Sequence, residues 1–120
     1  MSDNKIPGVN MEAGLDLYGG EMDIYMTVLE SFAANTLTAL DKMRNVTKEN
    51  LSDYAIIAHG IKSVSLTIAA EEISKRAMKL EVMAKAGDLA GVLAENDVFL
   101  KDVEILVSNV KHWLETADNS

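Results

Sequence analysis

The chain has 120 residues, of which 48% are hydrophobic and 25% are charged, and its formal net charge is −8. This length and composition predict one soluble globular domain over residues 1–120, with a single hydrophobic core. The 11 lysines and arginines are scattered along an acidic chain, which argues against nucleic-acid binding because phosphate contacts need clustered positive charge. Without cysteine the chain has no disulfides, thiolate metal sites or cysteine nucleophiles.

Two features of the sequence bear on membranes and targeting. No apolar run approaches the roughly 20 residues that a transmembrane helix needs. The polar N-terminus is not followed by the apolar segment of a signal peptide. We therefore expect a cytoplasmic protein that does not bind membranes.

The first third of the chain predicts a short helix and a long one. Residues 1–10 contain the single proline, Pro7, and we expect them to form an irregular N-terminal segment. A short helix is expected over residues 11–18, where a pair of glycines follows. Apolar residues then recur at spacings of three and four over residues 21–44, which predicts the first long helix.

Three further helices are predicted in the rest of the chain. Asn50 is a suitable N-cap for a helix whose core stripe runs from Leu51 to Ile68. The next helix is expected over residues 70–86, followed by a C-cap glycine and an N-cap aspartate at Gly87-Asp88. The last helix carries the most regular stripe, with buried positions expected at Phe99, Val103, Leu106, Val110 and Trp113. Four amphipathic helices with short connections predict an all-α, antiparallel up-and-down four-helix bundle with a short N-terminal helix.

His59 is predicted to lie on the outside of this bundle. Successive helical residues advance by about 100°, which turns His59 about 120° away from the core stripe of its helix. Lys62 lies one turn further on, between His59 and the edge of the core. A second strip of the same helix faces outward and carries no charged side chain; its members are Ser52, Ile56, His59, Ser63, Leu66 and Ala70. An exposed uncharged strip indicates a surface for partner docking.

An exposed imidazole next to a lysine suits phosphoryl chemistry. Histidine titrates near neutral pH, so an unprotonated ring nitrogen is available to attack phosphorus. The Lys62 ammonium is placed to stabilise the phosphoryl oxygens. No acidic residue occurs at positions 56, 60, 62, 63 or 66 of the same helix. Because no general base, metal or nucleotide loop accompanies the cluster, it can hold a phosphoryl group but cannot take one from ATP unaided.

The segment around His59 also resembles a known family. Residues 58–70, AHGIKSVSLTIAA, are similar to the signature helix of histidine-containing phosphotransfer domains, and Ile6-Pro7-Gly8-Val9, residues 15–20 and Leu80-Glu81 ahead of Gly87-Asp88 resemble bacterial members of that family. The resemblance implies that His59 reversibly accepts a phosphoryl group from an aspartate of a receiver domain and passes it to another receiver. It implies no cofactor of its own, because the receivers bring Mg²⁺, and no autonomous kinase activity.

The resemblance also implies which proteins bind this chain and where. The partners would be the receiver domains of response regulators and a hybrid sensor kinase, and the protein itself would be a monomer. We expect partner contacts from Ser52, Ile56, Gly60, Ser63, Leu66, Thr67 and Ala70. The family commonly has glycine where this chain has Ser63 and Ala69. The Ser63 hydroxyl is able to donate a hydrogen bond to the phosphoryl group, and the Ala69 methyl is expected to affect partner fit more than the fold.

Other interpretations were weighed against phosphotransfer. A docking adaptor or inhibitor of two-component proteins on the same fold would not need to retain His59 and Lys62. The dimerising helix pair of a sensor kinase would want an acidic residue after the histidine, where this chain has Gly60. His112 and Glu115 form half of a bundle metal site, but a second pair is lacking. We therefore expect no metal site, and a structural or solvated role for His112.

Overall fold

The computed structural model describes residues 5–118, and all regular secondary structure within this range is helical. The five helices are α1 (Met11–Leu17), α2 (Met22–Asp41), α3 (Leu51–Thr67), α4 (Glu71–Lys85) and α5 (Leu89–Asp118). Each predicted helix is confirmed, with boundaries that differ from the expected ones by a few residues. The expected N-terminal irregular segment is non-helical over residues 5–10, and its residues 1–4 lie outside the described range.

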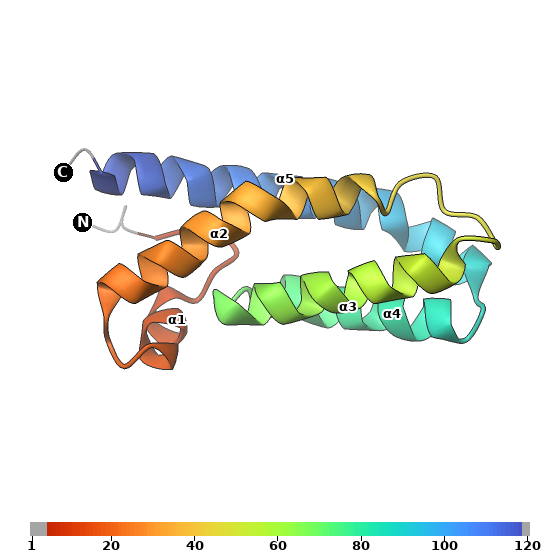
Figure 1. The fold of residues 1–120 in the computed structure, drawn as a ribbon, viewed down its shortest axis with the longest axis horizontal. Helices are drawn as coiled ribbons and strands as arrows, with labels where there is room; N and C mark the ends of the chain where they lie inside the picture. The colour runs from red at the N-terminus through yellow and green to blue at the C-terminus, as the bar shows by residue number, and fades with distance from the viewer. Residues whose placement is uncertain (1–4, 119–120) are drawn as a thin grey trace.

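The four long helices lie side by side along an elongated molecule of 48 × 23 × 21 Å (Figure 1). Helices α3 and α4 make the most extensive contact with each other, and α2 and α5 form a second pair. The two pairs meet mainly where α4 packs against α5. Figure 1 shows that α1 lies beneath the start of α2, beyond the end of the α3–α4 pair. No helix within residues 5–118 has both the length and the apolar character needed to cross a membrane.

The core is built from the apolar stripes that the sequence predicts. Residues three and four apart lie on one helical face, so each stripe turns inward against its neighbours. The largest fully buried side chains are Tyr25, Tyr54, Phe32, Phe99, Ile6, Leu29, Leu40, Met43, Ile61, Ile68, Leu80 and Val92. In α5 the expected stripe is buried from Phe99 to Val110, while Trp113 is half-buried against the core.

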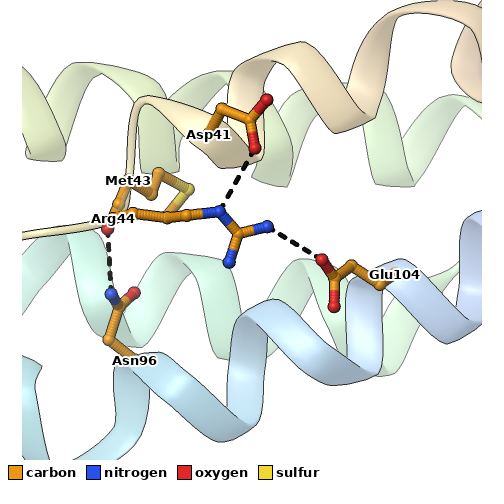
Figure 2. Close-up of polar contacts among 5 residues, drawn as sticks. All are labelled: Asp41, Met43, Arg44, Asn96 and Glu104. Atoms are coloured by element: carbon orange, nitrogen blue, oxygen red, sulfur yellow. Dashed lines mark hydrogen bonds and ion pairs between the residues drawn. The ribbon is translucent and has the colours of Figure 1, made fainter.

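Polar contacts fix the end of α2 against α5, as Figure 2 shows. The Arg44 guanidinium donates from Nη2 to Glu104 Oε2 at 2.8 Å and from Nε to Asp41 Oδ1 at 3.2 Å. The buried Asn96 amide donates from Nδ2 to the Met43 carbonyl at 2.9 Å. The Met43 carbonyl, two residues beyond the end of α2, is therefore satisfied inside the core.

Helix caps set the short connections, and one predicted cap differs in detail. Gly87 adopts a left-handed φ of 78° after α4, and Asp88 Oδ1 accepts from the Gly91 amide at 2.9 Å, as the C-cap and N-cap prediction requires. Asn50 is the N-cap of α3, but its side chain does not cap that helix. Its Oδ1 accepts instead from the Thr47 amide at 2.8 Å, which closes the preceding turn.

The C-terminus of α3 is held by two tyrosines from the N-terminal part of the chain. Tyr18 Oη donates to the Thr67 carbonyl at 2.6 Å, and Tyr25 Oη donates to the Ile68 carbonyl at 3.0 Å. Burial raises the pKa of Tyr25 to about 12, with a smaller contribution from Tyr18. Ala69 follows with a left-handed φ of 63°, which ends α3 and turns the chain into α4.

Candidate functional site

His59 lies on α3, with its imidazole at the boundary between α3 and α4. Its side chain is 55% exposed, so one side of the ring faces solvent, as the helical geometry predicts. The buried face of α3 at this level is formed by Ala58 and Ile61, which belong to the core. The backbone of α3 is also tied to α4 one turn away, where Ser74 Oγ donates to the Lys62 carbonyl at 3.0 Å.

The other side of the imidazole contacts a buried carboxylate. Glu81 of α4 has a side chain only 7% exposed, and its Oε2 lies 3.0 Å from His59 Nδ1. Glu81 entered the sequence-based prediction only through the family resemblance, and its contact with His59 was not predicted. The periodicity of α4 indicates only that Glu81 is buried, because Glu81 lies with Ala77, Leu80 and Ala84 on the face of α4 that enters the core.

Two lysines compensate the charge of this carboxylate. Lys85 Nζ lies 2.8 Å from Glu81 Oε2, and Lys62 Nζ lies 3.7 Å from Oε1. The hydrogen bond from Lys85 lowers the pKa of Glu81 below its ordinary value of 4.5, burial opposes this, and His59 lowers it further. Glu81 is therefore ionised at neutral pH.

The ionised Glu81 fixes the tautomer of the imidazole. A carboxylate only accepts hydrogen bonds, so in the 3.0 Å contact His59 Nδ1 carries the hydrogen and donates it. In the neutral ring the second nitrogen, Nε2, then holds the free lone pair. The side chain is held at one nitrogen and offers the other as a nucleophile.

Comparisons with protein-family models, with curated proteins and with solved structures found no match for this chain. The chemistry of the site follows from its own side chains.

Lys62 lies where the sequence places it, one turn from His59 and at the edge of the core. Its side chain is half-buried, and the 3.7 Å separation from Glu81 Oε1 is an ion pair longer than a hydrogen bond. The ammonium is therefore only loosely attached to Glu81. Such a cation is able to turn toward an anion bound at His59.

Most of the predicted docking strip is exposed. Ile56 and Leu66 are large exposed apolar side chains, and Ser52, Gly60 and Ser63 are exposed as well. Thr67 is half-buried.

Ala70 does not belong to this strip, contrary to the prediction. It is fully buried and serves as the N-cap of α4. The helical wheel was extended past the end of α3 at Thr67, where the chain turns and the 100° spacing no longer holds.

Exposed apolar side chains also occur on α4. Met78 and Val82 are both more than half exposed. Met78 lies three residues before Glu81, so the two side chains leave neighbouring parts of the α4 surface. Neither Met78 nor Val82 belongs to the predicted docking strip, because the strip follows from the spacing of α3 residues alone.

No cluster of three or more histidine, aspartate and glutamate side chains suited to a metal ion occurs within residues 5–118. His112 lies exposed on α5, and its carbonyl accepts a hydrogen bond from Thr116.

Proposed function

We propose that this protein is a phosphocarrier of a phosphorelay, in which His59 accepts a phosphoryl group from the aspartate of one receiver domain and passes it to another. The observation that carries the proposal is the geometry of His59. Its Nδ1 is held 3.0 Å from a buried, ionised carboxylate, while the ring is 55% exposed. A histidine held in this way presents Nε2 to a partner. In this proposal the four long helices form an antiparallel up-and-down bundle that keeps α3 and α4 rigid beneath the ring.

In the first transfer, from a receiver to this protein, His59 is the nucleophile. His59 Nε2 attacks the phosphorus of the aspartyl phosphate, the N–P bond forms, the bond to the aspartyl oxygen breaks, and the receiver's carboxylate leaves with the bonding pair. Positive charge develops on the imidazole during this step. The Glu81 carboxylate on Nδ1 stabilises that charge, as a carboxylate does for the histidine of a hydrolase triad.

Lys62 acts on the phosphoryl group that is being transferred. Its ammonium, loosely paired with Glu81, turns toward the phosphoryl oxygens and stabilises their charge. The receiver supplies Mg²⁺ and its own catalytic groups. The protein is accordingly a stoichiometric intermediate without autonomous kinase activity. It acts as a monomer in the cytoplasm between a hybrid sensor kinase and response regulators.

A transfer experiment tests the proposal. The protein is mixed with a receiver domain that has been phosphorylated in the presence of Mg²⁺, and the products are treated with acid and with alkali. A phosphocarrier gains a phosphate that is labile in acid and stable in alkali, and His59→Gln does not. A protein that binds the receiver without ever gaining phosphate would instead be a docking adaptor.

A further inference from the structure

Two positively polarised groups share one oxygen of Glu81. His59 Nδ1 lies 3.0 Å from Oε2, and Lys85 Nζ lies 2.8 Å from the same atom. Lys62 lies at the other oxygen, Oε1, at 3.7 Å. The stronger the attraction of Lys85 for Oε2, the less of the carboxylate's charge acts on the imidazole.

We propose that Lys85 is a positioning residue that acts through Glu81 to set how strongly the His59 ring holds a proton, and hence how readily a phosphoryl group on that ring is released. This inference rests on the proposed function of His59. Lys85 lies on α4, away from the motif around His59 in the sequence. It borders a shallow depression of about 220 Å³ together with Ala55, Ile56, His59 and Glu81.

The link between the proton and the phosphoryl group follows from the chemistry of the ring. When phosphorus is bonded to Nε2, a neutral ring has a bare lone pair on Nδ1, which would face the Glu81 carboxylate and be repelled. A proton on Nδ1 removes this repulsion and makes the ring an imidazolium. In hydrolysis, a water oxygen then bonds to phosphorus, the N–P bond breaks, and its electron pair returns to Nε2. The neutral imidazole keeps the Nδ1 proton, and both protons of the water leave with inorganic phosphate.

Lys85 weakens this effect of Glu81. Its ammonium neutralises part of the charge at Oε2 and also repels an imidazolium directly, so both actions favour the unprotonated ring. Lys62 from α3 pairs with the other oxygen of Glu81, and the residues that line the depression besides His59, Glu81 and Lys85 are the uncharged Ala55 and Ile56. Lys85 therefore lengthens the lifetime of the phosphorylated state, and Glu81 shortens it.

Variants of Lys85 and Glu81 test whether Lys85 acts on His59 through Glu81. Lys85→Met is compared with Glu81→Gln, with the double variant, and with Lys79→Met as a matched control. Lys79 is another α4 lysine of similar exposure, 63% against 66%, and it pairs with Glu95 at 3.0 Å on the side of α4 toward α5. NMR titration of the His59 ring is recorded on each unphosphorylated protein. The hydrolysis rate is then measured against pH on each protein phosphorylated with phosphoramidate.

We expect Lys85→Met to raise the proton affinity of the ring and the hydrolysis rate near neutral pH by about two- to fivefold, the range of an exposed ion pair. Glu81→Gln lowers both the proton affinity of the ring and the hydrolysis rate. In the Glu81→Gln background the effect of Lys85→Met becomes smaller, and Lys79→Met matches the wild type throughout.

Equal titration and hydrolysis in Lys85→Met and the wild type would overturn the inference. So would an effect of the same size with and without the Glu81 carboxylate. Failure of the proposed function gives a different result: no phosphate would pass from a receiver to His59, while the titration and the chemically phosphorylated protein would still report on Lys85.

Discussion

The predicted docking strip can be tested by the substitution Leu66→Glu. Leu66 is 50% exposed, so about half of the 1.5–3 kcal/mol available from burying a leucine is lost, about 1 kcal/mol. Leu66 is also next to the last residue of α3, where a negative charge is unfavourable by about 0.3–1 kcal/mol. We expect a loss of roughly 1.5 kcal/mol in the free energy of unfolding, which leaves the protein folded.

The effect on a bound receiver should be larger. A carboxylate that loses its water inside the contact without gaining a partner costs about 2–5 kcal/mol. Because 1.4 kcal/mol corresponds to a factor of ten, the Kd for the receiver should rise at least about 30-fold. Calorimetric binding and quench-flow transfer with one receiver domain measure this, and urea denaturation measures the stability.

Ile105→Glu is the matched control for this experiment. Ile105 is 51% exposed on α5, so the substitution creates the same charge at an apolar residue of equal exposure away from His59. We expect receiver binding and transfer close to the wild type. The reasoning would be refuted if Leu66→Glu folded and transferred phosphate normally, or if both variants lost binding to the same extent.

Three other predictions concern the site and the fold. His59→Gln abolishes phosphoryl acceptance, measured with labelled phosphate, and lowers the unfolding free energy by about 1 kcal/mol, because the hydrogen bond to Glu81 is lost while Lys85 still pairs with that carboxylate; His112→Gln transfers normally. Lys62→Ala slows transfer or shortens the phosphohistidine lifetime by the equivalent of roughly 2–3 kcal/mol without abolishing transfer, as quench-flow would show. Tyr25→Phe leaves the buried Ile68 carbonyl without its hydrogen bond and costs about 1–3 kcal/mol in urea denaturation. Because burial raises the pKa of Tyr25 from 10.0 to about 12, its stabilisation is complete below pH 10 and is lost as the pH rises to 12, which circular dichroism would follow.

Each of these predictions has a contradicting outcome. Phosphate on the His59→Gln protein would place the acceptor elsewhere in the chain. Unchanged transfer rates and phosphate lifetimes in Lys62→Ala would make Lys62 a lysine that only packs over the core edge. If Tyr25→Phe lost as much stability as the wild type between pH 10 and 12, another group would cause the alkaline transition.

The helices and the exposure of His59 could be predicted because both depend on local periodicity. A stripe repeating at three and four residues determines which face of a helix is buried, and the caps around Gly87 determine where one helix ends and the next begins. The position of His59 outside the core follows from the same spacing.

The contact between His59 and Glu81 could not be derived in this way. It depends on the register in which α3 packs against α4, and the stripe of one helix does not encode its longitudinal position on another. The sequence predicts the acidic neighbours of His59 only along its own helix, α3. The carboxylate that fixes the ring comes from 22 residues further along the chain.

The left-handed turn at the end of α3 could not be predicted from helical periodicity either. Ala69 was expected to affect partner fit through its methyl group, but it is buried and has a φ of 63°. A left-handed conformation costs a non-glycine residue about 1–2 kcal/mol. The cost therefore falls on the fold, and the same turn removes Ala70 from the docking strip.

In the proposed mechanism, His59 Nε2 carries the phosphoryl group while Glu81 holds Nδ1. NMR of the protein phosphorylated by a receiver domain, with phosphorus spectra and long-range proton–nitrogen correlations of the ring, identifies which nitrogen is bonded to phosphorus. We expect a single phosphohistidine at His59 with phosphorus on Nε2 and a proton shared between Nδ1 and Glu81. Phosphorus on Nδ1, or on a residue other than His59, would contradict it.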